Sequence, residues 1–246
     1  MRAIARLDIK GDSVIKGISF EGLRKVGDPQ TLAVSYYQQG ADELLLIDTV
    51  ATLYGRNNLF HIVERACEGV FVPITVGGGI RTLHDVEQAL ASGADKVAIN
   101  SEAIRRPEFV TEIASRFGAQ CCVVSIEAKR RVDGWEAYTE NGRNPSGLEV
   151  ATWVGRLNDL GAGEILLTSV DCDGTRRGLD LPLIERVESA TRVPVIASGG
   201  IGKVDHVAAL VDRRSSVSVA VASALHYKSF SIEELKRVTG DEQNPC

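Results

Sequence analysis

Short runs of apolar residues recur along the whole chain, and turn-forming residues follow each of them. Between these runs, apolar residues stand three and four positions apart, as in the segment around Val86, Ala89 and Leu90, which is the pattern of a helix that buries one face. Strands that alternate with helices predict a parallel sheet. The runs predicted to be strands are Ala3–Ile9, Glu43–Asp48, Pro73–Val76, Lys96–Ile99, Cys121–Glu127, Glu164–Ser169, Pro194–Ala197 and Val217–Val221.

The number of predicted strands separates the common parallel architectures. Eight near-continuous apolar strands with a crossover after each, in 246 residues, match a closed barrel better than an open doubly wound sheet. A chain of this length is within the usual range of one such barrel. We therefore expect an α/β fold in which residues 1–246 form a single (β/α)8 TIM barrel domain.

An internal repeat relates the two halves of the chain. The segment VPITVGGGI at Val72–Ile80 returns as VPVIASGGI at Val193–Ile201, 121 residues later. DELLLID, which begins at Asp42, pairs with GEILLTS, which begins at Gly163, at the same offset. A half barrel repeated twice predicts two similar sites, one in each half, at the same end of the barrel.

Glycine and small polar residues follow four of the predicted strands. Glycine allows backbone N–H groups to approach an anion, and the start of the next helix favours negative charge. Turns also need glycine, but two copies at symmetric positions favour phosphate binding and a ligand with a phosphate at each end. The candidate residues are Gly77, Gly78 and Gly79, Asn100 and Ser101, Ser198, Gly199 and Gly200, and Ala222 and Ser223.

Two carboxylates end the first and fifth predicted strands, where LDIK and IEAK correspond in the repeat. Asp8 and Glu127 are expected on opposite sides of the barrel mouth. A ligand that spans two phosphate sites would lie across them, so that one carboxyl donates a proton and the other removes one. Alternatively, each carboxylate caps a turn or pairs with Lys10 or Lys129.

The segment after the first strand is long and contains several glycines. It reads KGDSVIKGISFEGLRKVGDP, with Lys16 near its middle. Loops of this length in barrels often close over a ligand and exclude water, and a lysine there can neutralise phosphate or developing charge. The other interpretation is a solvated charge on a hairpin.

Composition narrows the choice of partners. A net charge of -5 and an isoelectric point near 5.5 give no basic field for nucleic acid. Five cysteines without metal-ligand spacing indicate neither a disulfide framework nor a zinc site, so no metal or other cofactor is expected. The sequence shows no apolar run of membrane-spanning length and no signal-peptide pattern, so we expect no membrane association and a cytoplasmic location.

Several motifs together resemble the cyclase subunit family of imidazole glycerol phosphate synthase, a (β/α)8 enzyme of histidine biosynthesis. They are ARLDIKG, TVGGGIR, GADKVAIN, GAGEILLTSVDCDGT, IASGG and ASALHY, and they extend over nearly the whole chain. The resemblance implies a heterodimer with a glutaminase, whose ammonia reacts with a bisphosphorylated ribulosyl aminoimidazole carboxamide. The products would be imidazole glycerol phosphate and a purine-pathway intermediate.

The same resemblance assigns roles to individual residues. Asp8 and Glu127 match the two catalytic aspartates of the family, and Lys16 matches its lid lysine. Asp173 and Gly174, within GAGEILLTSVDCDGT, join the candidate phosphate contacts.

Four further charged residues begin strands and are expected on the opposite face of the barrel. By resemblance, Asp95 beside them faces the glutaminase, and the four form the gate through which ammonia enters the barrel. They are Arg2, Glu43, Lys96 and Glu164. A ring of alternating charges can also simply pair at the barrel bottom.

Glu127 departs from the aspartate of the family. The longer side chain could displace the carboxyl by ~1 Å, which can cost on the order of 100-fold in rate, unless it folds back. The change also fits a paralogue that channels ammonia for nucleotide-sugar amidation in surface polysaccharide synthesis. A third interpretation, a sugar isomerase of the same pathway, has no need for the gate residues.

Overall fold

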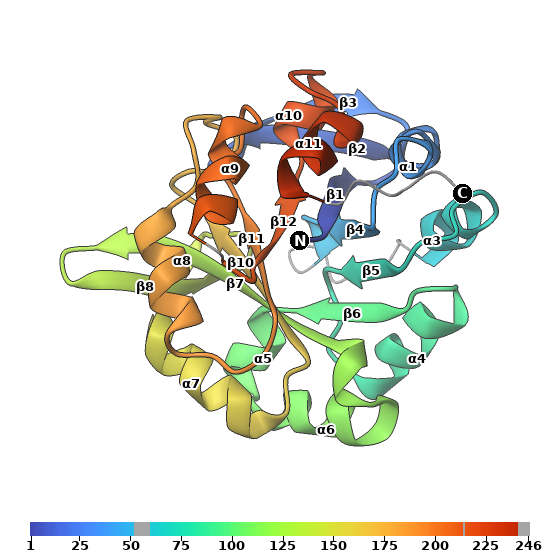
Figure 1. The fold of residues 1–246 in the computed structure, drawn as a ribbon. Coiled ribbons are helices and arrows are strands. Elements are labelled where there is room, and N and C mark those ends of the chain that lie inside the picture. The colour runs from blue at the N-terminus through green and yellow to red at the C-terminus, as the bar shows by residue number, and fades with distance from the viewer. Residues whose placement is uncertain (52–59, 214, 241–246) are drawn as a thin grey trace.

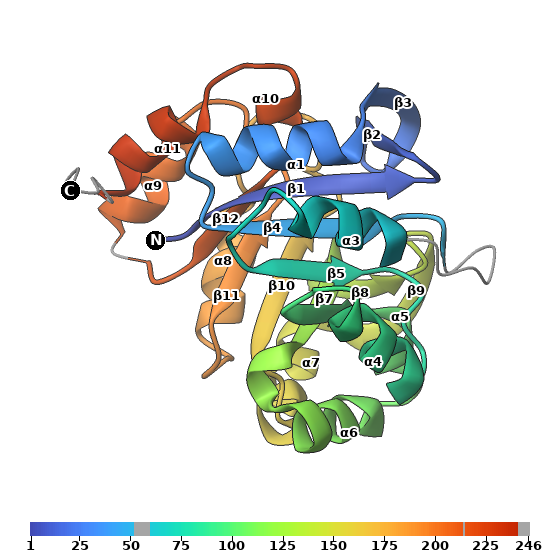
Figure 2. The ribbon, with the colours of Figure 1, turned by 90° about the vertical axis from the view of Figure 1, so that its right-hand side faces the viewer.

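A computed structural model describes residues 1–51, 60–213 and 215–240 of the chain. Eight parallel strands form a closed barrel in which each strand pairs with the next and the last pairs with the first (Figures 1 and 2). The predicted (β/α)8 barrel is therefore confirmed. In order around the barrel the strands are β1 (Ala3–Lys10), β4 (Glu43–Asp48), β5 (Ile74–Gly77), β6 (Lys96–Ile99), β7 (Cys122–Arg131), β10 (Glu164–Ser169), β11 (Val195–Ser198) and β12 (Ser218–Val221).

Four strands, β5, β7, β11 and β12, begin one residue later than predicted, and two of them, β5 and β11, follow a proline. Pro73 and Pro194 have no N–H to donate to a ladder, but their carbonyls accept hydrogen bonds from Leu44 and Ile165 at the barrel edge. Proline is thus placed just before each of these two strands rather than inside it. A larger difference concerns β7, which extends four residues beyond Glu127 because it continues into a hairpin.

Helices surround the barrel and bury one face each against the strands (Figure 1). Trp153 is the largest fully buried side chain. The helices of at least eight residues are α1 (Pro29–Gln38), α3 (Phe60–Cys67), α4 (Leu83–Ala91), α6 (Glu108–Phe117), α7 (Val150–Leu160), α8 (Leu181–Glu188), α9 (Asp205–Asp212) and α11 (Ile232–Thr239). Shorter turns are α5 (Ser101–Arg105), η1 (Ala119–Cys121) and α10 (Ser223–His226). Within the described ranges, no helix has both the length and the apolar content that crossing a membrane requires.

Two antiparallel hairpins extend the barrel at its mouth. One consists of β2 (Ser13–Ile18) and β3 (Glu21–Gly27) after β1; the other consists of β8 (Gly134–Thr139) and β9 (Asn144–Glu149) after β7. The first hairpin contains the predicted lid segment. The second was not predicted, although Asp133-Gly134 between two β-rich stretches is a recognised hairpin signal.

The barrel interior is built in layers because alternate residues of each strand point inward. A middle layer is apolar and separate from the larger core between strands and helices; its members are Ile4, Leu45, Ala98, Val123, Leu166, Ile196 and Ala220. Arg2 stands two positions before Ile4, just ahead of β1, and Arg6 and Asp8 stand two and four positions after Ile4. Polar layers therefore lie on both sides of an apolar one.

Candidate active site

Asp8, near the end of β1, lies between two cations. Its Oδ1 accepts a hydrogen bond of 2.8 Å from Arg6 Nε, and its Oδ2 accepts one of 2.8 Å from Lys16 Nζ. Burial alone would raise the pKa of this carboxyl, but Arg6 and Lys16 outweigh burial and hold the pKa well below its usual range. Asp8 is therefore ionised throughout the neutral range.

Lys16 is buried beneath the barrel mouth, although it belongs to the first hairpin. Its ammonium group binds Asp8 and also both carboxylate oxygens of Asp173, at 3.0 and 2.8 Å. Phe20, at the hairpin tip, covers both Lys16 and Arg6, with its ring centre 5.8 and 5.7 Å from their cationic groups. A solvated lysine on a hairpin is thus the wrong description of Lys16.

Glu127 reaches the same region from β7 but meets a different environment. Its Oε2 accepts a hydrogen bond of 2.7 Å from the Gly142 amide, in the turn of the second hairpin. Burial raises the pKa of Glu127 to about 7, since the Gly142 amide, Arg6 and Asn100 compensate only in part and Asp8 adds repulsion. Near neutral pH, Glu127 is therefore present in both protonated and ionised forms.

Neither carboxylate pairs with the lysine two residues after it. Lys10 is exposed and makes no ion pair within the described part of the chain, whereas the Lys129 ammonium lies 4.8 Å from the centre of the Tyr138 ring. The predicted alternative in which Lys10 and Lys129 neutralise Asp8 and Glu127 is therefore wrong.

Arg6 is the polar residue of this region that sequence reasoning missed. It is 3% exposed, and its Nη1 crosses the lumen to Thr168 Oγ1 at 2.9 Å and Ser198 Oγ at 3.3 Å. A usable signal was present, because Arg6 stands two residues before Asp8 and must share its inward face. Its neighbours on both sides are apolar, so the run is typical of a buried strand and does not by itself indicate a charge in the lumen.

The first-half phosphate candidates line a cavity beside Glu127. Gly78, Gly79, Asn100 and Ser101 all contribute to it, together with the basic side chain of Arg81. A Cβ at Gly78 would lie 2.2 Å from the Asp48 carbonyl oxygen, so that only glycine fits there. Gly77 ends β5 and does not line this cavity.

The second-half candidates divide into two groups. Gly174 and Ser223 line a cavity with Lys16, and two arginines, Arg24 and Arg176, lie on the same lining. The remaining candidates are absent from the lining of this cavity: Asp173, which instead binds Lys16; Ser198, which binds Arg6; and Gly199, Gly200 and Ala222.

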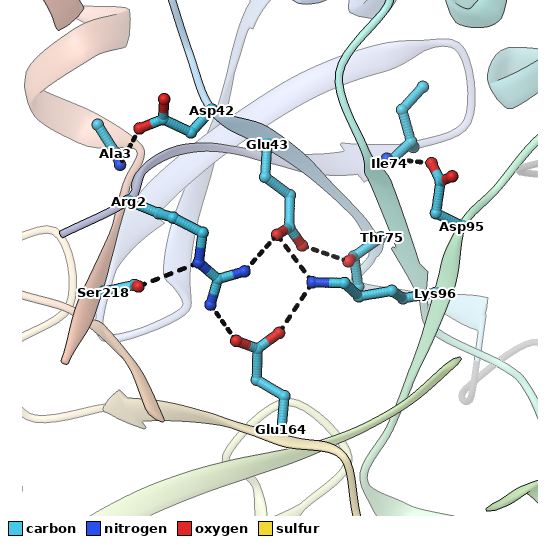
Figure 3. Close-up of polar contacts among 10 residues, drawn as sticks. All are labelled: Arg2, Ala3, Asp42, Glu43, Ile74, Thr75, Asp95, Lys96, Glu164 and Ser218. Carbon is cyan, nitrogen blue, oxygen red and sulfur yellow. Dashed lines mark hydrogen bonds and ion pairs between the residues drawn. The ribbon is translucent and has the colours of Figure 1, made fainter. Parts of the chain in front are cut away.

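The four predicted gate residues form one closed ring at the opposite end of the barrel (Figure 3). Arg2 pairs with Glu43 and Glu164, and Lys96 bridges the same two carboxylates at 2.9 and 3.0 Å. Thr75 donates a further hydrogen bond of 2.6 Å to Glu43, and Ser218 accepts one from Arg2. Alternating charges therefore satisfy one another around the barrel axis, directly below the apolar layer.

Asp95 lies at the rim of this ring and is exposed. Its carboxylate accepts a hydrogen bond of 2.8 Å from the Ile74 amide, as Asp42 accepts one of 2.7 Å from the Ala3 amide (Figure 3). Each aspartate thus supplies a partner to a backbone amide at the start of a neighbouring strand. This local role leaves the outer side of Asp95 open to solvent.

Comparison with known proteins gives a family match and similar curated proteins. The profile of a family described as "Histidine biosynthesis protein" matches residues 2–231. The protein named "Imidazole glycerol phosphate synthase subunit HisF" from Legionella pneumophila is 58% identical over 206 residues, which are 83% of this chain and 97% of the relative. The family match includes both carboxylates and the charged ring. The chain therefore belongs to the histidine biosynthesis protein family.

Proposed function

We propose that this protein is an enzyme of the imidazole glycerol phosphate synthase type and acts as its cyclase subunit. It would use ammonia to convert a bisphosphorylated ribulosyl aminoimidazole carboxamide into imidazole glycerol phosphate and aminoimidazole carboxamide ribonucleotide. The observation that carries the proposal is the unequal pair of carboxyls at the barrel mouth, Asp8 ionised and Glu127 protonatable near pH 7. The likeness to the named synthase subunit supports the same reaction.

The two cavities fit a substrate with a phosphate at each end. Gly78, Gly79 and Ser101 offer backbone and hydroxyl donors on one side of Glu127. Gly174, Ser223 and two arginines offer donors on the side of Lys16. A ligand that spans both sites would lie over the two carboxyls, where proton transfer is needed.

The chemistry divides between the two carboxyls. Ammonia adds to the ribulosyl carbonyl carbon, and the carbonyl oxygen must be protonated before it leaves as water. Protonated Glu127 can supply that proton, whereas Asp8 can accept one from the attacking nitrogen. The added nitrogen then bonds to the carbon that links the two halves of the substrate, which closes the ring. The bond from that carbon to the aminoimidazole nitrogen breaks, and this nitrogen takes up a proton and leaves as the amine of aminoimidazole carboxamide ribonucleotide. We therefore assign the reaction to the C–N lyases. This scheme requires no metal or other cofactor.

The partner would be a glutaminase that docks at the charged ring. Arg2, Glu43, Lys96 and Glu164 lie on the barrel axis, and the layer above them is apolar. Neutral ammonia can cross an apolar layer, whereas ammonium pays a large desolvation cost. The ring and the layer would together admit ammonia from below and retain charged species.

Direct turnover tests the proposal. The full chain is supplied with the ribulosyl substrate and ammonium salt at pH 8, and release of imidazole glycerol phosphate is measured beside a known cyclase subunit. We expect ammonia-dependent turnover that no added metal increases. Product from the known enzyme and none from this chain would overturn the proposal.

The partner assignment has a separate test. In a complex with a glutaminase subunit, glutamine-dependent turnover of Lys96→Met should fall relative to its ammonium-dependent turnover. Equal changes in both rates would contradict a role of the ring in ammonia entry.

A further inference from the structure

Burying a guanidinium inside a barrel lumen is costly unless other groups pair with its charge and accept its hydrogen bonds. Arg6 is buried, donates to Asp8 through Nε, and spans the lumen to Thr168 and Ser198 through Nη1. The Phe20 ring covers the guanidinium from the side of the hairpin. Four partners from four different segments therefore fix its position.

The position of Arg6 relates it to both carboxyls. Thr168 pairs in register with Glu127 on the neighbouring strand, so the far end of the guanidinium lies beside the Glu127 strand. Of the two carboxyls, Asp8 receives a hydrogen bond from Arg6, whereas Glu127 accepts one from the Gly142 amide. The counterpart of Arg6 in the sequence repeat is Ser125, so the second half of the barrel has no equivalent cation.

We propose that Arg6 is a positioning residue that decides which of the two carboxyls carries the proton. It holds Asp8 ionised and oriented across the lumen, and it leaves Glu127 as the protonated member of the pair. This inference rests on the proposed function, because it assigns the donor and the acceptor of that reaction. An arginine suits the task better than a lysine, since its planar fork bonds Asp8 and Thr168 at once.

Other charged groups also face Asp8 and must be separated from Arg6 in any test. Lys16 approaches from β2 and shares its charge with Asp173, which follows β10. Glu127 faces Asp8 from β7, and His226 of α10 lies within electrostatic reach. Burial lowers the pKa of His226 to about 4, so it is neutral above about pH 5 and becomes charged only in the acid part of a titration.

The decisive measurement does not depend on activity. Carboxyl carbons are labelled with ¹³C, Asp8 is assigned by its loss in Asp8→Asn, and its chemical shift is followed from pH 3 to 8. The wild-type signal should remain that of a carboxylate down to pH 3, whereas in Arg6→Met a titration midpoint of Asp8 should rise into the measured range. In Arg6→Lys the rise should be smaller. An Asp8 signal in Arg6→Met that also shows no midpoint above pH 3 would overturn the proposal, because Lys16 alone would then set the charge of Asp8.

Turnover supplies the second arm. The acid limb of the pH profile of kcat/KM should move toward neutral in Arg6→Met, whereas Thr168→Val, which keeps the Asp8 contact, should lower kcat without moving that limb. If Arg6→Met does not fold, Arg6→Lys and Thr168→Val provide the same contrast. If the wild type shows no turnover but Arg6→Met still shifts the titration midpoint of Asp8, the proposed function is refuted and the role of Arg6 is not.

Discussion

The two halves of the barrel share one arrangement of strand, carboxylate and hairpin, but the two carboxylates have different electrostatic partners. In each half the first strand ends near a carboxylate and continues into an antiparallel hairpin: β1 into β2 and β3, and β7 into β8 and β9. The first hairpin returns an ammonium group, Lys16, to Asp8. The second returns a backbone amide, from Gly142, to Glu127.

This difference shows what duplication fixes and what it leaves open. The repeated scaffold places both carboxyls at one end of the barrel, whereas the hairpins determine how each one titrates. A full positive charge lowers the pKa of a buried carboxyl far more than one neutral N–H does. Two groups at equivalent positions can thereby serve as acid and base in one reaction.

The largest effect is expected from Asp8→Asn, which removes the proton acceptor of the first half. General base catalysis contributes about 10²–10⁴-fold, so kcat with ammonium should fall by that factor while KM changes less. Asp12→Asn is the matched control, because Asp12 follows the same strand and its side chain is 90% exposed. Comparable losses in both variants would contradict a special role of Asp8.

Lys16→Met tests the cation that distinguishes the first hairpin. The change leaves Asp8 and Asp173 buried without this shared partner, so the free energy of unfolding should fall by about 3 kcal/mol in urea denaturation at pH 7. Lys25→Met, at an exposed position of β3, should change it by less than about 0.5 kcal/mol. Similar losses in both would show that the hairpin does not depend on the buried pair.

Glu127→Asp tests the reach of the second carboxyl. The side chain of Glu127 is long enough to bond the Gly142 amide at 2.7 Å. A shorter residue would withdraw the carboxyl by about 1 Å, and kcat should fall by roughly 10- to 100-fold. The reciprocal variant Asp8→Glu serves as the comparison. A higher kcat in Glu127→Asp would instead identify Glu127 as a substitution that weakens the cyclase.

The smallest effect concerns stability against pH. The pKa of Glu127 is about 7 in the folded protein and 4.5 in the unfolded chain, so the folded state binds the proton more tightly. Glu127 therefore stabilises the folded state fully below about pH 4.5, and this stabilisation is lost as pH rises through about 7. The loss should amount to about 1–2 kcal/mol in the free energy of unfolding, because the side chain is only partly buried.

Urea denaturation between pH 5 and 8 measures this term. Glu127→Gln should show a flatter pH dependence over that range than the wild type. Asp8→Asn should keep the wild-type slope over that range, since the stabilisation from the lowered pKa of Asp8 is complete above its unfolded value of 3.8 and is lost only in stronger acid. Identical dependence of unfolding free energy on pH for all three proteins would contradict a raised pKa of Glu127 and hence the electrostatic difference between the two halves.

Local periodicity determined much of this protein. Alternating strands and helices predicted the barrel, the repeat placed Asp8 and Glu127 at one end of it, and strand starts placed the charged ring at the other. These features depend on the spacing of residues within a single element, which a sequence displays directly. Of the predicted strand ends, the large error was at β7, where a hairpin continues the strand.

Only the tertiary structure decided the charge state of the site. The partners of Asp8 come from its own strand and from a hairpin, and Arg6 binds residues on strands more than 160 positions away. Whether Lys16 is solvated or buried depends on where its hairpin folds, and the pKa of Glu127 depends on how much water that folding removes. Desolvation and charge proximity are properties of the assembled barrel, because they sum over groups that the sequence keeps apart.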